Sequence, residues 1–264
     1  MDTRKKIKTD NNKTKHPQYG MVVDLDKCTG CGACSVACAV ENNQQPATPD
    51  MCSRTGNTWR MMYKVKNGEP FPDTKAVFVP MFCQQCDDPP CKYVCPQNAV
   101  ELDPMTGIVA QIPERCFGCR YCHAACPYEA RYFNWWDPKW PEGMEKTLNP
   151  DVSPRMRGVV EKCNFCHGRW QSARAKAAAE GRRELREDEY KTACQESCPT
   201  EAITFGDLRD PDSKVSKLVK DPDTFTILGR LGTKPKVFYR TTRSWVRRTV
   251  DRDIYSENKE KVHG

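Results

Sequence analysis

The stretch Cys116–Pro127 reads Cys-Phe-Gly-Cys-Arg-Tyr-Cys-His-Ala-Ala-Cys-Pro, with three evenly spaced cysteines and a fourth just before a proline. This is the spacing at which cysteines bind iron–sulfur clusters. Three near-copies occur elsewhere in the chain, the last of them split by a long insertion. The four blocks are Cys28, Cys31, Cys34 and Cys38; Cys83, Cys86, Cys91 and Cys95; Cys116, Cys119, Cys122 and Cys126; and Cys163, Cys166, Cys194 and Cys198.

Disulfides and zinc are the alternative uses of so many cysteines. Cysteines this close in the chain are hard to bridge without strain, and no disulfide framework requires repeated blocks of this kind. A zinc site needs two C-x2-C pairs, whereas each block here has a third cysteine, which suits an iron–sulfur cluster. We therefore predict four clusters of the [4Fe–4S] type, with [3Fe–4S] as the alternative where one ligand points away.

The composition agrees with loops that are stabilised by metal. Apolar residues make up 38% of the 264 residues, alongside 20 prolines and 15 glycines. Cluster binding can contribute folding free energy to a chain with so few apolar residues. The net charge is +7, but the basic residues lack the interleaved aromatic side chains of a nucleic-acid module. We predict no nucleic-acid partner.

The sequence predicts neither a membrane span nor an export signal. No window approaches the roughly 18 apolar residues that a transmembrane helix requires. Residues 1–20 contain neither an apolar signal-peptide core nor an Arg-Arg pair. We expect this chain to carry no export signal of its own.

Apolar and alternating runs predict strands over residues 19–25, 61–65, 76–80, 108–112 and 203–208, and a helix over 35–42. A helical hairpin broken at Gly181 is expected over 168–190. We predict an α+β fold of two ferredoxin-like two-cluster modules, one inserted in the other. The parts are a flexible basic arm, 1–19; an outer module with loop and hairpin insertions, 20–75 and 127–208; an inner module, 76–126; and a C-terminal docking tail, 209–264.

The cysteines can be assigned to clusters from the rule that the fourth cysteine of each block binds the other block's cluster. The short hairpin between the second and third blocks pairs these two, so the first and fourth blocks pair around them. The predicted ligand sets are Cys28, Cys31, Cys34 with Cys198; Cys83, Cys86, Cys91 with Cys126; Cys116, Cys119, Cys122 with Cys95; and Cys163, Cys166, Cys194 with Cys38.

Several polar residues lie beside the predicted ligands. They are Lys92, Arg120, His123 and His167. We expect them to serve in packing and hydrogen bonding near the clusters, with tuning of the reduction potential as the alternative. Cys52, the one cysteine outside the blocks, is expected to be an inert buried thiol.

The order of the blocks and the split fourth block resemble the four-cluster iron–sulfur subunits of the dimethyl sulfoxide reductase and polysulfide reductase family. In this chain Cys163-Asn164-Phe165-Cys166 follows Gly158-Val159-Val160-Glu161-Lys162. Residues 231–239, Leu-Gly-Thr-Lys-Pro-Lys-Val-Phe-Tyr, also look like the C-terminal motif of these subunits. The resemblance covers about residues 19–240.

Trp135-Trp136 and Asn149-Pro150-Asp151-Val152 look most like the same region in quinone-linked membrane complexes such as menaquinone reductase. The resemblance implies a molybdopterin-oxidoreductase-like partner, a polytopic quinone-binding membrane subunit and, in some complexes, a multihaem cytochrome c. It also implies a peripheral position on the periplasmic face of the cytoplasmic membrane, with export alongside a partner that carries the signal.

The predicted function is an electron relay through four clusters, without substrate chemistry in this chain. A soluble polyferredoxin that carries electrons between cytoplasmic enzymes is the alternative, and a zinc-stapled scaffold is a third. The basic charge, the long insertions and the charged C-terminal segment favour a subunit over a free carrier. We expect the arginines of that segment to form a docking surface on a membrane subunit or anionic lipid, with a solvated tail as the alternative. They are Arg240, Arg243, Arg247, Arg248 and Arg252.

Overall fold

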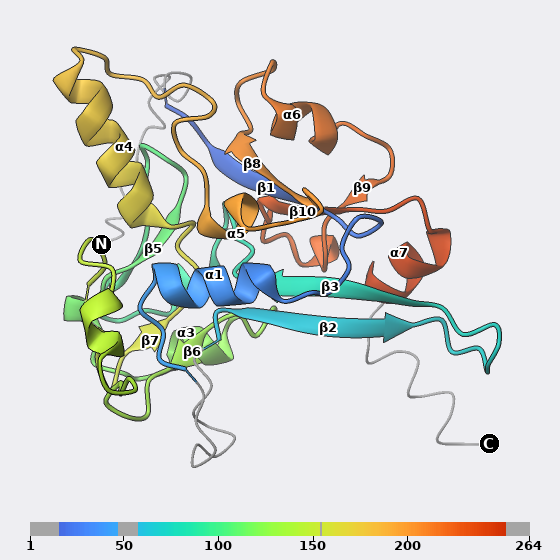
Figure 1. Ribbon diagram of the computed structural model, residues 1–264, viewed down its shortest axis with the longest axis horizontal. Coiled ribbons are helices and arrows are strands. Elements are labelled where there is room, and N and C mark those ends of the chain that lie inside the picture. Colours follow the sequence, from blue (N-terminus) through green and yellow to red (C-terminus); the bar gives the residue numbers. More distant parts are fainter. Residues whose placement is uncertain (1–15, 47–57, 154, 252–264) are drawn as a thin grey trace, which may run out of the picture.

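The computed structural model describes residues 16–46, 58–153 and 155–251. Cys52 and all but the end of the predicted basic arm lie outside these ranges. Short helices and small sheets make up the structure (Figure 1), which agrees with the predicted mixed α and β class. Within the described ranges, no helix is long and apolar enough to cross a membrane.

A four-stranded sheet with the order β8-β1-β10-β9 joins residues far apart in the sequence. Strand β1 (Tyr19–Asp24) pairs antiparallel with β8 (Ile203–Asp207) and parallel with β10 (Val237–Arg240). Strand β9 (Thr224–Phe225) pairs with β10 at the edge. Strands β1 and β8 match the strands predicted before the first cysteine block and after the fourth.

Residues 209–251 belong to the fold and do not form a tail. Helix α6 (Lys214–Val219) packs against β8 and β1, and α7 (Ser244–Asp251) packs against β2 (Arg60–Lys66). Tyr239 in β10 is fully buried, and its hydroxyl donates to the carbonyl oxygen of Pro80 at 2.9 Å. The prediction of a tail was wrong here because a strand of four residues with a parallel partner some 200 residues away leaves little local signal.

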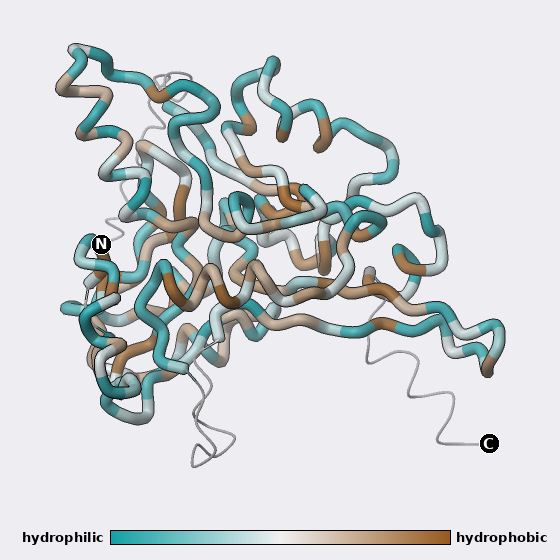
Figure 2. Tube along the Cα trace, viewed as in Figure 1, coloured by the Kyte–Doolittle hydropathy of each residue, from teal (hydrophilic) through white to brown (hydrophobic). Residues whose placement is uncertain are grey.

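Strand β2 pairs with β3 (Ala76–Phe82) in a separate hairpin that extends away from the central sheet (Figure 1). Its inner end is buried, with Val79 and Phe82 in the main core. The far end of the hairpin is mostly hydrophilic, as are most outer loops (Figure 2). The predicted edge hairpin in the first insertion is therefore present.

Short helices hold the third cysteine of each block. Cys34, Cys91, Cys122 and Cys194 are all buried in helices α1 (Ala33–Glu41), α2 (Pro90–Tyr93), α3 (Tyr121–Ala124) and α5 (Ala193–Glu196), respectively. Two further hairpins link the blocks: β4 (Val100–Leu102) with β5 (Val109–Gln111), and β6 (Tyr132–Phe133) with β7 (Val160–Glu161). Single 3₁₀ turns occur at Pro113–Arg115, Met144–Thr147 and Gly229–Leu231.

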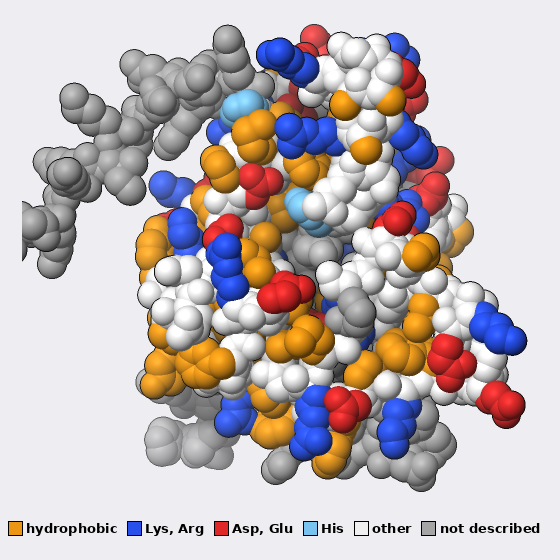
Figure 3. Space-filling model, turned by 90° about the vertical axis from the view of Figure 1, so that its left-hand side faces the viewer, with side chains coloured by type: hydrophobic (Ala, Val, Ile, Leu, Met, Phe, Trp, Pro, Cys, Tyr) orange, Lys and Arg blue, Asp and Glu red, His pale blue; other side chains and the backbone are white. Residues whose placement is uncertain are grey.

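The insertion in the fourth block contains one helix, α4 (His167–Ala179). The predicted second helix after Gly181 is absent from the described chain, where residues 182–190 form turns. Arg182 pairs with Glu180 and Glu189 at 2.6 Å and ties these turns together. In Figure 3, the face on the α4 side shows acidic and basic side chains interspersed.

Candidate iron–sulfur cluster sites

Three pockets are each lined by four cysteines, of which three belong to one block and the fourth to another. We number these sets by the block that supplies most of their cysteines. The first set is Cys28, Cys31, Cys34 and Cys198; the second is Cys83, Cys86, Cys91 and Cys126; the third is Cys116, Cys119, Cys122 and Cys95. Each combination is the one that the sequence predicts.

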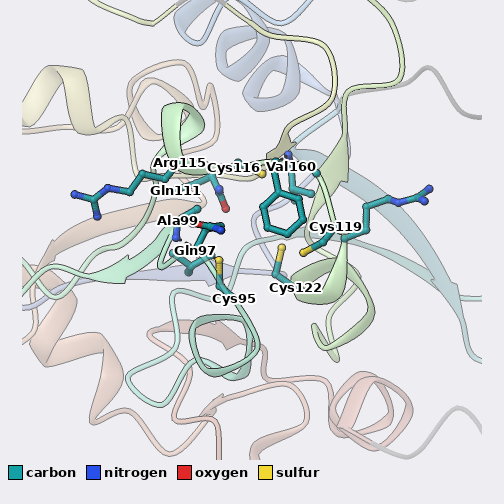
Figure 4. A pocket seen from close by; sticks show the side chains of 13 residues that line it. Cys95, Gln97, Ala99, Gln111, Arg115, Cys116, Cys119, Cys122 and Val160 are labelled. Atoms are coloured by element: carbon teal, nitrogen blue, oxygen red, sulfur yellow. Dashed lines mark hydrogen bonds between the residues drawn. The ribbon is translucent and has the colours of Figure 1, made fainter.

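The third set shows how separate segments contribute to one site (Figure 4). Cys95 follows α2, Cys116 follows a 3₁₀ turn, and Cys122 lies in α3. Their sulfur atoms and that of Cys119 surround the same central space. Gly118, at the edge of this space, has a φ of 81°, and a Cβ there would lie 2.2 Å from the carbonyl oxygen of Gly158, so only glycine fits this position.

The remaining block cysteines form the fourth set, which is Cys38, Cys163, Cys166 and Cys194. All four side chains are buried. Burial raises the pKa of Cys166 well above its usual value, and the negative charges of Cys194, Cys38 and Cys163 raise it further. Helix α1, which carries Cys38, packs against α5, which carries Cys194, and the N–H of Ala193 in α5 donates to Cys166 Sγ at 3.5 Å.

The same turn follows Cys95, Cys126 and Cys198. Each of these cysteines lies in a set whose other three members come from a different block. The sequence Cys-Pro-x-x-Ala begins at Cys95, Cys126 and Cys198. In each copy the fourth residue is left-handed although it is not glycine: Asn98 has a φ of 49°, Glu129 of 50° and Glu201 of 49°. This rare conformation turns the next backbone N–H back toward the cysteine.

The turn supplies hydrogen bonds to sulfur. The N–H of Ala99 donates to Cys95 Sγ at 3.2 Å, and that of Ala202 donates to Cys198 Sγ at 3.3 Å. Burial raises the pKa of Cys126, while the backbone N–H of the alanine in its own turn lowers it. Such donors stabilise negative charge on a sulfur, as a cluster ligand requires.

Cys38 lies in α1 and has no such turn. The side-chain amides of Asn42 and Gln44 approach its Sγ at 3.7 and 3.4 Å instead. Both side chains are buried and also donate to the Cys38 carbonyl oxygen. Two side-chain donors thus replace the backbone donor of the other sets, which sequence analysis did not foresee.

Two buried arginines lie against the cysteine sets. Arg60 Nη2 lies 2.9 Å from Cys194 Sγ, and the guanidinium stacks on the Phe82 ring at 3.9 Å from its centroid. Arg131 Nη1 donates to Gln111 Oε1 at 2.8 Å. Both side chains are 2% exposed, and neither arginine was among the residues predicted from the sequence to lie at a cluster.

The sites fit an anionic, iron-containing group. Arg60 Nε and Nη1 and Arg131 Nη2 are buried and have no hydrogen-bond partner among the described residues. Burial raises the pKa of Cys86 to about 12, so its thiol is protonated unless a metal holds it as thiolate. Nowhere in the described ranges do three His, Cys, Asp or Glu side chains gather around the position of a single metal ion.

The polar residues that flank the ligands differ in their surroundings. Lys92 and His123 are exposed. Arg120 stacks near Trp135 at 4.8 Å from the ring centroid, and His167 stacks on Trp170 at 5.2 Å. Burial lowers the pKa of His167, which favours its neutral form. Packing is thus what the structure shows for Arg120 and His167, as the sequence analysis expected.

Comparison with known proteins gives matches over the regions that contain the cysteine blocks. A family model described as 4Fe-4S dicluster domain matches residues 74–142, and one described as 4Fe-4S binding domain matches residues 19–40. The menaquinone reductase iron–sulfur cluster-binding subunit of Nitratidesulfovibrio vulgaris is 52% identical over 250 residues, which cover 94% of this chain and 96% of the relative. The chain belongs to the family of iron–sulfur subunits of multisubunit reductases.

Other members of this family extend the comparison. A putative dimethyl sulfoxide reductase iron–sulfur subunit of Halobacterium salinarum is 37% identical over 84% of this chain and 78% of its own length. The arsenate respiratory reductase iron–sulfur subunit of Shewanella sp. is 35% identical over 84% and 95%. The predicted electron-transfer role and the [4Fe–4S] type of cofactor are confirmed.

Proposed function

We propose that this family member relays electrons through four [4Fe–4S] clusters, each held by one of the four cysteine sets. The observation that carries the proposal is the exchange of the fourth cysteine: Cys126 lies with the second set and Cys95 with the third. When bound, such clusters accept and donate single electrons. The chain's own part is to hold them by thiolates, N–H donors and buried cations.

The sets follow one another in the order first, fourth, second, third. Arg60 interacts electrostatically with Cys34 of the first set and Cys194 of the fourth. Cys83, in the second set, packs against the core cluster that contains Cys163 of the fourth. Arg131 is influenced by sulfurs of the second and third sets alike. This order supports a single path with its ends at the first and third sets.

Both ends of this path reach the surface. Cys31 of the first set is exposed. Beside the third set, Phe117 and Tyr121 are 61% and 64% exposed, although both are large apolar side chains. Exposed aromatic residues are enriched where proteins bind one another, so we assign these ends to contacts with redox partners.

The partners that we propose are a molybdopterin-oxidoreductase-like subunit and a polytopic quinone-binding membrane subunit, with a multihaem cytochrome c as a further component. The names of the menaquinone and dimethyl sulfoxide reductase subunits support this choice. We place the chain peripherally on the periplasmic face of the cytoplasmic membrane, exported together with a partner.

We propose the nested arrangement of modules on the same basis. The inner module, 76–126, would hold the second and third sets, while the outer one, 20–75 and 127–208, would hold the first and fourth. The dicluster match over 74–142 supports an inner unit. Arg243, Arg247 and Arg248 are exposed and keep a proposed docking role, although Arg243 also pairs with Asp26 at 3.3 Å. Arg240 is engaged by Asp24 and Asp221 at 3.0 and 2.8 Å, and Arg252 lies outside the described residues.

Purification from native membranes tests this function against the soluble polyferredoxin alternative. We expect the chain to copurify with membrane-bound subunits and to be reduced or oxidised by quinone analogues in that complex. A native protein recovered as a free soluble monomer would overturn the relay-subunit proposal.

A further inference from the structure

Arg60 is placed where two cysteine sets meet. It is the first residue of β2, and this strand brings its side chain into the interior beside α1 and α5. The sulfurs that act on it most strongly are Cys194 and Cys34, which belong to the fourth and first sets. The face of the Phe82 ring covers the guanidinium, and water does not reach its Nε or Nη1.

Arg131 occupies the corresponding place between the other two sets. It directly precedes β6, four residues after the proline that follows Cys126. The sulfurs that act on it most strongly are Cys91 and Cys122, which belong to the second and third sets. Its Nη1 donates to the neutral amide of Gln111 at 2.8 Å, and its side chain lines the pocket of the second set.

Neither arginine is neutralised by a carboxylate in the structure as described. A buried guanidinium keeps its proton and is costly to bury without a compensating negative charge. The charges that contribute most to the raised pKa of either arginine are those of cysteine sulfurs. Since each arginine faces two sets, each is shared by two sites, and the two arginines come from unrelated segments of the chain.

We propose that Arg60 and Arg131 are redox-tuning residues, each raising the reduction potentials of both clusters between which it lies. The proposal rests on the ligand sets proposed above. Reduction adds one negative charge to a site, and a fixed cation nearby stabilises that charge strongly because little solvent intervenes. Arg60 tunes the first and fourth sites, and Arg131 tunes the second and third.

The test is a redox titration, followed by EPR, of the native complex carrying Arg60→Gln or Arg131→Gln. We expect Arg60→Gln to favour the oxidised form of two clusters at least tenfold, which is about 59 mV for a one-electron couple. The other two clusters should be unaffected, and Arg131→Gln should show the complementary pattern. Arg183→Gln, which removes an exposed charge, is the matched control and should shift none.

Lysine variants separate charge from packing. Arg60→Lys and Arg131→Lys keep the positive charge and should keep potentials close to those of the unaltered complex. If a glutamine variant loses iron, the lysine variant carries the test and should restore both iron and potentials. Unchanged potentials in fully loaded glutamine variants would overturn the proposal. It would also be overturned if the lysine variants lost iron, or if their potentials fell as far as those of the glutamine variants.

Iron content distinguishes this proposal from the proposed function on which it rests. Four clusters in the unaltered complex with unshifted potentials in the variants would reject the tuning role alone. Fewer than four clusters in the unaltered complex would reject the ligand sets themselves.

Discussion

The side-chain amide of Gln85 donates a hydrogen bond of 2.7 Å to the carbonyl oxygen of Cys163, which joins the second cysteine block to the fourth. Its oxygen accepts a hydrogen bond of 2.8 Å from the N–H of Val109 in β5. Lys162 Nζ donates to the carbonyl oxygen of Cys163, as Gln85 does, and also to the carbonyl oxygen of Val109. Gln85 and Lys162 are almost completely buried, so they link the segments that carry the second, third and fourth sets.

Replacing Gln85 with leucine should destabilise the protein. The change leaves the buried N–H of Val109 without its partner, which costs about 1–3 kcal/mol. We expect a lower denaturant midpoint and faster loss of cluster absorbance on heating. Gln171→Leu, on the exposed side of α4, is the matched control. Equal stability of the two variants would show that the Gln85 bridge contributes nothing.

Tyr239→Phe tests whether the C-terminal strand is part of the core. The hydroxyl of Tyr239 donates to Pro80 O and accepts from Gln84 Nε2 at 3.2 Å, and both buried hydrogen bonds would be lost, although Gln84 Nε2 keeps its bond to Phe82 O. We expect a loss of about 1–3 kcal/mol in the free energy of unfolding, measured by denaturation. The Tyr121→Phe change, at an exposed residue, should alter the free energy of unfolding little. An equally small effect of Tyr239→Phe would indicate that the C-terminal strand is not part of the core.

The left-handed residue of the Cys-Pro-x-x-Ala turn predicts opposite effects of two substitutions. Glu201→Gly removes the cost of a positive φ, whereas Glu201→Val places a β-branched residue where the strain is greatest. We expect the glycine variant to retain full iron and the valine variant to lose iron from the first site. Glu184→Val, in an exposed segment with ordinary φ, controls for the valine itself; equal iron in both glutamate-to-valine variants would contradict the role of the turn.

Ala202→Pro removes the N–H that donates to Cys198 Sγ at 3.3 Å. Loss of a donor to sulfur destabilises the reduced state, so the potential of the first cluster should fall while the other three stay constant. Redox titration followed by EPR measures this, and Ala202→Gly, which keeps the N–H, is the matched variant. If the proline variant binds its full complement of iron and has the same reduction potentials as the glycine variant, the hydrogen bond does not tune the first cluster.

Much of the site could be predicted from sequence because cluster ligation depends on local spacing. The first three cysteines of each of the three unsplit blocks and the turn after Cys95 are fixed by neighbours a few residues away. The strands beside the blocks have clear apolar alternation, and β1, β2, β3 and β8 lie where expected.

The features that sequence missed depend on contacts between distant segments. Arg60 and Arg131 were not recognised because a charged residue is normally exposed, and only the folded chain shows the sulfurs that compensate their burial. Arg131 gave a weak signal, since it occurs among aromatic residues directly after a cysteine block. Strand β10 was missed because its partner β1 lies at the other end of the chain.

The central claim is that sixteen cysteines hold four [4Fe–4S] clusters with their fourth ligands exchanged between blocks. An EPR redox titration of the purified native complex, with iron analysis, tests it most directly when repeated with Cys126→Ser and Cys95→Ser. We predict four clusters in the unaltered protein, with Cys126→Ser altering the cluster of the second set and Cys95→Ser that of the third. Fewer than four clusters in a fully loaded sample, or alteration of the third-set cluster by Cys126→Ser, would contradict it.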